Sequence, residues 1–247
     1  MRRAALWLVP GGAVLWALAG ADIEAARIIG AGARLADFLG RMVPPDLSVW
    51  RDMMTGLAET LRIAVLGTLF AVVLSAGLGA LASETLAPAA VWRPVRAVLA
   101  VIRAIPLILV AMLMVGAVGL GPLPGILAVT FHATGMLAKF YAEAIDNVSA
   151  APVAALESAG ATRAQRLRFG VWPQMAPVVL RDTVFRFELN LRESLILGIV
   201  GAGGIGLHVQ TYVRSFQYEK AATVTLAIIA LVLVSEAVNT ALQRRFS

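Results

Sequence analysis

Residues 152–206 read PVAALESAGATRAQRLRFGVWPQMAPVVLRDTVFRFELNLRESLILGIVGAGGIG. The first third of this stretch is basic, has the spacing of a helix and is interrupted by a glycine. The middle third carries three arginines and three acids, and the last third consists almost entirely of glycine and aliphatic residues. This order predicts a polar helical loop that leads into a membrane span.

The composition around this stretch is that of a polytopic membrane protein. The 247 residues are 60% hydrophobic and only 15% charged, and the mean hydropathy is +0.83. About a quarter of the residues of a soluble domain are charged. The composition therefore predicts an all-α chain embedded in a bilayer.

Apolar runs predict six transmembrane helices. Residues 4–21 and 63–83 carry no charge, and the second run gives about 31 Å of helix, enough to cross a bilayer. Residues 104–138 are too long for one span, and three glycines and two prolines in GLGPLPG (119–125) predict a tight turn inside them. Two further spans are expected at about 177–207 and 221–242.

The chain has no cysteine and two separate histidines, which excludes disulfides and gives no metal-ligand spacing. The first apolar run resembles a secretory signal, but we favour a retained first span. The net charge of +6 is explained by arginines in the loops between spans rather than by nucleic-acid binding.

These arginines predict the orientation. With six alternating spans, ten arginines fall on one side: Arg2, Arg3, Arg93, Arg96, Arg103, Arg163, Arg166, Arg168, Arg244 and Arg245. The opposite side holds residues 22–60, with six acids and four arginines. The positive-inside rule then predicts that both termini and the 139–176 loop are cytoplasmic.

The 139–176 loop has the pattern of an amphipathic helical element. Gly160 divides it, Thr162 and Gln165 have the form of a capping box that restarts a helix, and Pro173 is expected to end it. A short helix–turn–helix of this kind fits a socket on a soluble partner. An interfacial helix lying on anionic membrane lipid is the alternative.

In this loop, Gly160 is followed thirteen residues later by Pro173, the spacing of the EAA motif of ABC importer permeases. The segments PPDLS (44–48), RAIPLILVAMLMVGAVGLGPLPGILAV (103–129), FHATGMLAKFYAEAID (131–146), FGVWPQMAP (169–177) and FRFELNLRESLILGIVGAGGIG (185–206) resemble the permease of phosphonate-type ABC uptake systems. The resemblance covers about residues 40–245. One departure is that Ala154 stands where the motif has its leading Glu, and Glu157 lies one turn later.

The resemblance implies a type I ABC importer permease in the bacterial inner membrane, not an enzyme. Its partners would be a second copy of the chain, a cytosolic ATPase dimer that binds ATP and Mg, and a periplasmic binding protein. The chain itself has no phosphate-binding GxxxxGK[ST] loop and needs no cofactor. The expected segments are a first span at 1–21, an extracytoplasmic segment at 22–54 and a transporter domain at 55–247 with its coupling loop at about 150–173. The residues expected to contact the ATPase are Ala154, Glu157, Ser158, Gly160, Ala161, Thr162, Arg163, Arg166 and Pro173.

The fifth span is the candidate translocation path. Its charges should face a cavity, a partner or one another, and the pairs Asp182–Arg186 and Glu188–Arg192 have the four-residue spacing of helical ion pairs. Ion pairing that stabilises the bundle is the structural alternative to contact with an anionic substrate. The glycines after it either allow close helix packing or form an outer gate. Candidate path and gate residues are Lys139, Arg186, Glu188, Asn190, Arg192, Gly201, Gly203 and Gly204.

The resemblance implies import of a phosphonate or a related oxyanion such as phosphite, hypophosphite or phosphate. A permease for another small solute such as an amino acid remains an alternative. An ion-coupled secondary transporter would need an inverted repeat, and an intramembrane enzyme would need a nucleophile or a metal cluster beside Glu188 and Glu193.

Overall fold

The computed structural model describes residues 2–21 and 29–246, with the side chains of residues 11–21 and 29–241. The predicted 22–54 segment therefore lies partly outside the described residues, as do the side chains of Arg2, Arg3, Arg244 and Arg245. The chain divides into two compact units, residues 1–44 and 45–247. The first unit contains the helices α1 (Arg2–Ala19) and α3 (Ala31–Gly40).

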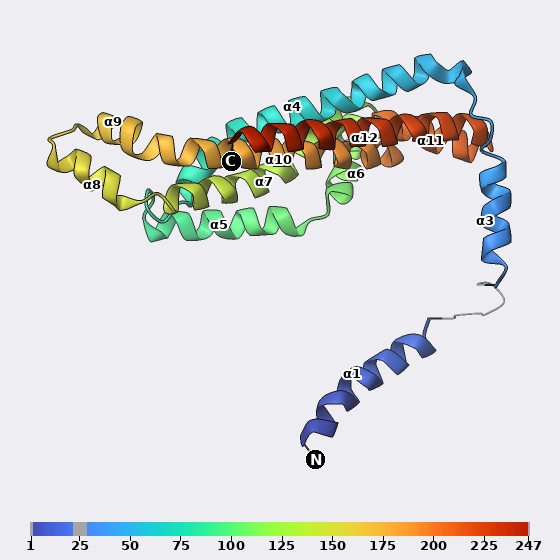
Figure 1. Ribbon diagram of the computed structural model, residues 1–247, viewed down its shortest axis with the longest axis horizontal. Helices are drawn as coiled ribbons and strands as arrows, with labels where there is room; N and C mark the ends of the chain where they lie inside the picture. The colour runs from blue at the N-terminus through green and yellow to red at the C-terminus, as the bar shows by residue number, and fades with distance from the viewer. Residues whose placement is uncertain (1, 22–28, 247) are drawn as a thin grey trace. The chain divides into compact units, whose positions relative to one another are not determined.

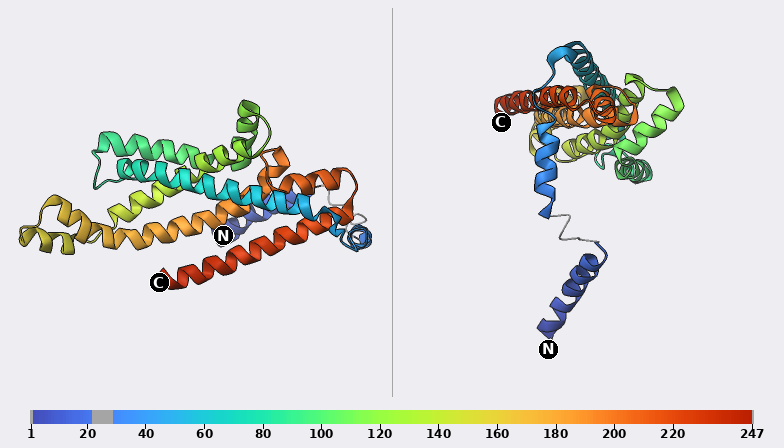
Figure 2. Two further views of the ribbon diagram at one scale, coloured as in Figure 1. Left: turned by 90° about the horizontal axis from the view of Figure 1, so that it is seen from above. Right: turned by 90° about the vertical axis from the view of Figure 1, so that its right-hand side faces the viewer.

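The second unit is a bundle of helices, which confirms the predicted all-α class (Figure 1). Helices α4, α7, α10 and α12 run alongside one another through the bundle, and α8 and α9 form one end of it (Figures 1 and 2). In chain order, the elements are η1 (Leu47–Val49), α4 (Trp50–Ala82), α5 (Ala89–Ala104), α6 (Leu107–Val118), α7 (Pro122–Asp146), α8 (Ala150–Ser158), α9 (Arg163–Gln165), η2 (Arg166–Val171), α10 (Trp172–Leu197), η3 (Gly198–Val200), α11 (Ile205–Arg214) and α12 (Tyr218–Phe246).

The number of spans differs from the six expected. Within the described residues, four helical stretches are long and apolar enough to cross a membrane, at 47–82, 122–146, 163–214 and 218–241. A fifth span exists if α5 and α6, which meet at an angle of 88°, cross together. The side chains of the first half of α1 lie outside the described residues, so the predicted first span stays a prediction.

The bent pair α5–α6 corrects one detail of the sequence analysis. Arg93, Arg96 and Arg103 were expected in a loop between spans, but all three lie in α5, which packs on α4 and α7. Arg103 therefore lies in the last turn of α5, ten residues of helix away from Arg93. Proline disfavours helix at the residue before it, and Ile105, before Pro106, is extended where the two helices meet.

The turn predicted at 119–125 is present. Gly119 and Gly121 have φ of +88° and +126°, values that glycine adopts without steric cost. Helix α7 begins directly after them, at Pro122, and proline is favoured in a first helical turn because its missing N–H has no partner there.

Helices α4 and α7 pack along their whole length through small residues. A Cβ on Gly67 would lie 2.6 Å from the side chain of Val129, and one on Gly79 would lie 2.8 Å from that of Tyr141. These distances are shorter than any real contact, so the two backbones approach this closely only because both positions are glycine. Small residues serve the same purpose in membrane helix pairs generally.

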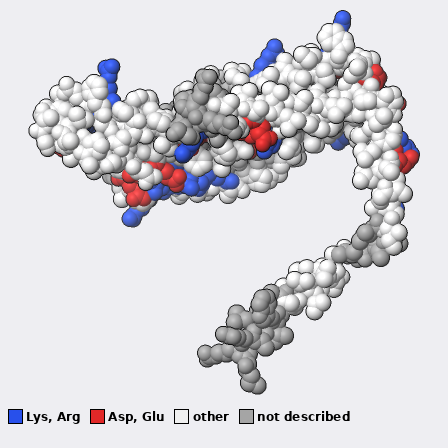
Figure 3. All heavy atoms as spheres, in the orientation of Figure 1, with Lys and Arg blue, Asp and Glu red and all other residues white. Residues whose placement is uncertain are grey.

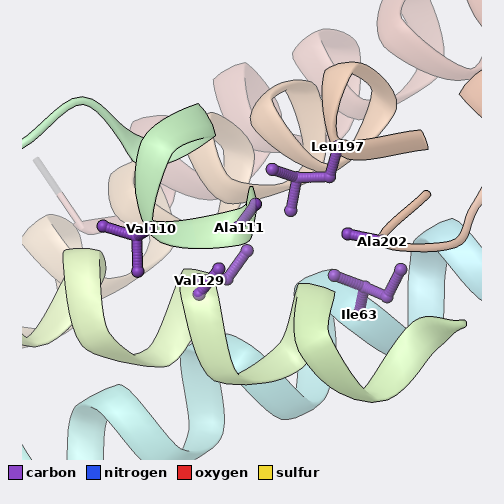
Figure 4. Packing of buried hydrophobic residues seen from close by; sticks show 7 residues of the cluster. Ile63, Val110, Ala111, Val129, Leu197 and Ala202 are labelled. Carbon is purple, nitrogen blue, oxygen red and sulfur yellow. The ribbon is translucent and has the colours of Figure 1, made fainter. Parts of the chain in front are cut away.

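A buried hydrophobic cluster joins four helices to the segment after α10 (Figure 4). Ile63 of α4, Val129 of α7 and Leu197 of α10 are each at most 1% exposed, and Ala202 packs among them. The glycine-rich segment is therefore seated in the core rather than on the surface.

Candidate functional site

The predicted coupling loop folds as two short helices around a glycine turn. Helix α8 ends at Ser158, and Gly160 follows with φ of +77°. The predicted capping box is confirmed, because the Thr162 side chain accepts from the Gln165 amide and the Gln165 side chain accepts from the Thr162 amide. This reciprocal pair restarts the helix after the turn. We call residues 150–173 the coupling segment.

Helix α8 rests on the π-turn η2 through a glycine. A Cβ on Gly170 would lie 3.1 Å from Leu156 and 3.2 Å from Val153, which are the half-buried residues of α8. Leu167 of η2, in contrast, is 59% exposed. The outward face of α8 and the turn consists of small or polar residues, namely Ala151, Ala154, Ala155, Ser158, Ala159 and Thr162.

Glu157 and Arg166 bind each other across the glycine turn, with 2.5 Å between the Glu157 Oε1 and Arg166 Nη1 atoms. The pair joins α8 to η2. Glu157 is the acidic residue nearest to Ala154, where the motif has its leading Glu, and it thus has an ion-pair partner within its own chain. Its side chain is nevertheless 65% exposed.

Pro173 does not end the helical element, contrary to the prediction. The chain stays helical from Arg163 to Val200, through η2 and into α10. Pro173 lies in the first turn of α10, where its missing N–H is tolerated. The π-turn η2 lies directly before α10 and changes the helical register there.

The glycine run forms a tight elbow between α10 and α11, residues 198–206. Gly201, Gly203 and Gly204 have φ near +80°. A Cβ on Gly206 would lie 2.0 Å from the Leu195 carbonyl oxygen, and one on Gly198 would lie 2.2 Å from the Leu207 amide. Both close packing and backbone conformation therefore require glycine in this elbow. The outer gate, the other predicted alternative, stays a prediction.

Two side chains of α4 hold the elbow, and neither was among the predicted site residues. The Gly204 amide donates to Glu59 Oε2 at 3.1 Å, and the Ile205 amide donates to Thr60 Oγ1 at 2.9 Å. These are free amides at the start of α11, so acceptors there also complement its helix dipole. The opposite wall is the turn before α7, where the Gly121 amide donates to the Gly201 carbonyl. The position of two polar residues shortly before the apolar run 63–83 was the available signal.

Arg186 is the most deeply buried charge of the described residues. It is 1% exposed, and its Nη2 atom lies 2.8 Å from Glu193 Oε2 and 3.0 Å from His132 Nδ1. The predicted Asp182–Arg186 pair is wrong, because Asp182 binds Arg181 instead. Glu193 lies seven residues after Arg186, about two turns further along the same face of α10. Pairing rules based on a spacing of three or four residues do not anticipate this partner.

The other predicted path residues bind partners other than Arg186. The predicted Glu188–Arg192 pair is present at 2.9 Å, and Glu188 also accepts from Asn239 of α12. Asn190 is fully buried and donates to Thr68 of α4.

Lys139, on α7, is paired with Glu143 at the helix surface, with side chains 43% and 48% exposed. The charges of the fifth span are thus mostly paired within this chain.

An apolar groove of about 1010 Å³ opens beside the coupling segment, between α4, α7, α8 and α10. Tyr141, Val179 and Leu180 lie in its walls, and Glu157 lines it from α8. The groove therefore reaches from the coupling segment into the bundle.

Residues 75–247 match the family model described as "Binding-protein-dependent transport system inner membrane component". The chain is 37% identical to the phosphite transport system permease protein PtxC of Stutzerimonas stutzeri, over 91% of this chain and 82% of that protein. It is 37% identical to the phosphate-import permease protein PhnE of Mycolicibacterium smegmatis, over 93% of this chain and 43% of that protein.

Among solved structures, the chain resembles a subunit of the MetNI methionine ABC transporter in inward-facing conformations. The TM-score is 0.71 at 22% identity, over 82% of this chain and 99% of the other, which shows a common fold. The family match covers more than half of the chain, and the phosphite permease aligns over most of both lengths. The chain therefore belongs to the inner membrane components of binding-protein-dependent transport systems, as the multi-pass, non-catalytic permease subunit of an ABC importer that works with an ATPase and a substrate-binding protein.

Proposed function

We propose that this permease imports a phosphorus oxyanion: phosphite, a phosphonate or phosphate. The observation that carries the proposal is the alignment with the phosphite permease over 91% of this chain. The phosphate-import relative is equally similar, and the substrates in the two names share a phosphorus atom with anionic oxygens. The likeness to a methionine transporter concerns the fold alone, so it does not favour an amino acid.

Uptake into proteoliposomes tests this substrate class. The vesicles contain the permease with its ATPase, the binding protein is added outside, and labelled phosphite is followed with and without ATP. We expect ATP-dependent uptake that phosphate or methylphosphonate reduces by competition. Uptake of labelled methionine but not phosphite would overturn the proposal.

We propose further that the coupling segment is the docking site of the ATPase. Its support is geometric: a rigid, capped turn with a small-residue face lies at one end of the bundle (Figure 1). A Cβ on Gly160 would meet nothing within 4 Å, so a large side chain there protrudes without a steric clash, and its only local cost is the strain of a positive φ. G160W should bind the ATPase poorly and lose uptake, whereas G160N, which tolerates positive φ, should retain most of it. Normal uptake by G160W would contradict this docking site.

The glycine elbow is, on this proposal, the outer gate of the path. Its glycines lower the cost of a change in backbone conformation, and two hydrogen bonds to side chains of α4 hold its last residues. On this proposal, the gate lies at one end of the bundle and the docking site of the ATPase lies at the other, as an importer requires.

The proposed assembly is a homodimer with both termini in the cytoplasm. Two observations support it: the arginine distribution described above, and the many exposed apolar side chains of α4, including Leu69, Phe70 and Val73. Two distinguishable tags on one chain, tested for co-purification, check the dimer. Since the sequence has no cysteine, single cysteines near each end, labelled by an impermeant reagent, check the orientation.

A further inference from the structure

Asp146, the last residue of α7, binds the turn between α4 and α5. Its Oδ1 atom accepts from the Ser83 hydroxyl at 2.6 Å and from the Thr85 amide at 3.1 Å. Its Oδ2 atom accepts from the Glu84 amide at 3.3 Å and from Arg96 Nη2 at 2.7 Å. One carboxylate thus holds three donors of a turn more than 60 residues earlier in the chain, and a fourth donor, Arg96, on α5.

This contact joins the end of α4 to the start of the coupling segment. Arg96 also donates to the Ala82 carbonyl at 2.8 Å, which fixes the last turn of α4 in the same cluster. Charged side chains gather near the start of α5 (Figure 3). Only residues 147–149 separate Asp146 from α8, so a displaced coupling segment pulls directly on this cluster.

The other end of α4 holds the glycine elbow. Thr60, which is fully buried, accepts from the Ile205 amide, and Glu59 accepts from the Gly204 amide. Both contacts, like those of Asp146, join a side chain to free backbone amides. They therefore fix the backbone of the elbow relative to α4.

Between these two ends, α4 is one uninterrupted helix. Thr60 and Ser83 are 23 residues apart, which corresponds to about 35 Å. Helix α4 contains no proline, the commonest cause of a sharp kink. At Gly67 and Gly79, α4 packs closely on Val129 and Tyr141 of α7.

We propose that α4 is a rigid link that carries the movement of the coupling segment to the elbow, with Asp146 and Thr60 as the positioning residues at its two ends. The inference rests on the proposed roles of the coupling segment and the elbow. When the ATPase displaces the coupling segment, Asp146 moves α4 together with α7, and Thr60 moves the start of α11. Breaking either end leaves ATP hydrolysis intact but separates it from the gate.

Two variants and two matched controls test the link in the complete transporter. D146N replaces one acceptor by a donor that faces Arg96 and the Glu84 amide, while E143Q changes a surface carboxylate one turn earlier. T60V removes the acceptor of Ile205 without changing side-chain volume, while T55V removes a hydroxyl that donates only within α4. The measured quantity is phosphite taken up per ATP hydrolysed, which a loss of folded protein does not change.

We expect D146N and T60V each to lower this ratio about tenfold, a usual size for coupling between distant sites. E143Q, T55V and the conservative T60S should stay within about twofold of the unmodified protein. Because the two contacts act in series, the double variant D146N/T60V should be no worse than either single variant. A double effect equal to the product of the single effects would mean two independent defects and would overturn the link, as would an unchanged ratio in D146N. If D146N does not assemble, R96Q, which removes one donor to Asp146, takes the place of D146N in the comparison of single and double variants.

A reporter on the elbow separates a failed link from a failed gate or docking site. Ile199 is 50% exposed, and I199C would be the single cysteine of the chain. We expect ATP to change its labelling rate in the otherwise unmodified transporter and not in D146N. An ATP response that persists in D146N overturns the link, whereas its absence from the parent transporter overturns the gate itself. Absence of ATP-dependent uptake by the parent overturns the proposed function.

Discussion

The coupling segment and the glycine elbow both depend on glycine at positive φ, but for different reasons. Around Gly160 there is empty space, and only the φ of +77° calls for glycine. In the elbow, a Cβ at Gly198 or Gly206 would overlap backbone atoms of the chain itself. The exposed turn is thus set by local conformation and the buried elbow by steric fit, so substitutions should separate the two regions clearly.

The largest effect is expected for G206A. Its Cβ would meet the Leu195 carbonyl oxygen, which belongs to the backbone and cannot rotate away. Overpacking of this kind costs about 1–3 kcal/mol or more, so thermal unfolding in detergent should occur at a lower temperature and uptake should fall. G77A is the control, because a Cβ on Gly77 of α4 meets nothing within 4 Å and alanine favours the helix. Equal stability of G206A and G77A would refute the steric account of the elbow.

A smaller effect is expected for G160A in the coupling segment. No atom obstructs the new methyl group, and the cost is that of left-handed backbone at a residue with a Cβ, about 1–2 kcal/mol. G160N should cost less, since asparagine adopts this conformation more readily. Local hydrogen exchange of α8 and α9 measures the difference. A global loss of stability like that of G206A would show that the turn is not locally determined.

T162A should act on the same turn through its cap. The Thr162 hydroxyl accepts from the Gln165 amide, and loss of such an N-cap typically costs about 1 kcal/mol. We expect faster hydrogen exchange in residues 163–171 and no change in the elbow. T162S, which keeps the hydroxyl, should behave like the unmodified chain, and faster exchange in T162S would contradict the capping role.

The smallest effect is expected for E157Q. Its ion pair with Arg166 is exposed on the glutamate side, and pairs of this kind contribute roughly 0.2–1 kcal/mol. The unfolding temperature of E157Q should hardly differ from that of the unmodified protein, and a higher salt concentration should make this difference smaller still. A marked loss of ATPase binding with unchanged stability would instead mean that Glu157 takes the place of the missing motif Glu.

Features with a local cause could be predicted from the sequence. The turn before Pro122 and the capping box at Thr162 follow from residues adjacent in the chain. Features set by distant contacts could not. Arg186 binds His132 and Glu193 rather than Asp182, and Glu59 and Thr60 cap a helix 145 residues away. Nothing in the local pattern encodes such partners, because they depend on how α4, α7 and α10 pack.

The pairing of α4 with α7 also has a consequence for biosynthesis. The Ser75 hydroxyl in α4 donates to the Thr134 carbonyl in α7, 59 residues later in the chain. At a synthesis rate of about 5–20 residues per second, Ser75 is made about 3–12 s before this partner. During that interval the glycine-lined face of α4 is uncovered and Ser75 lacks its acceptor in α7. The insertion machinery must therefore keep α4 within reach until α7 arrives, and a pause in translating residues 83–121 would prolong the exposure of this face.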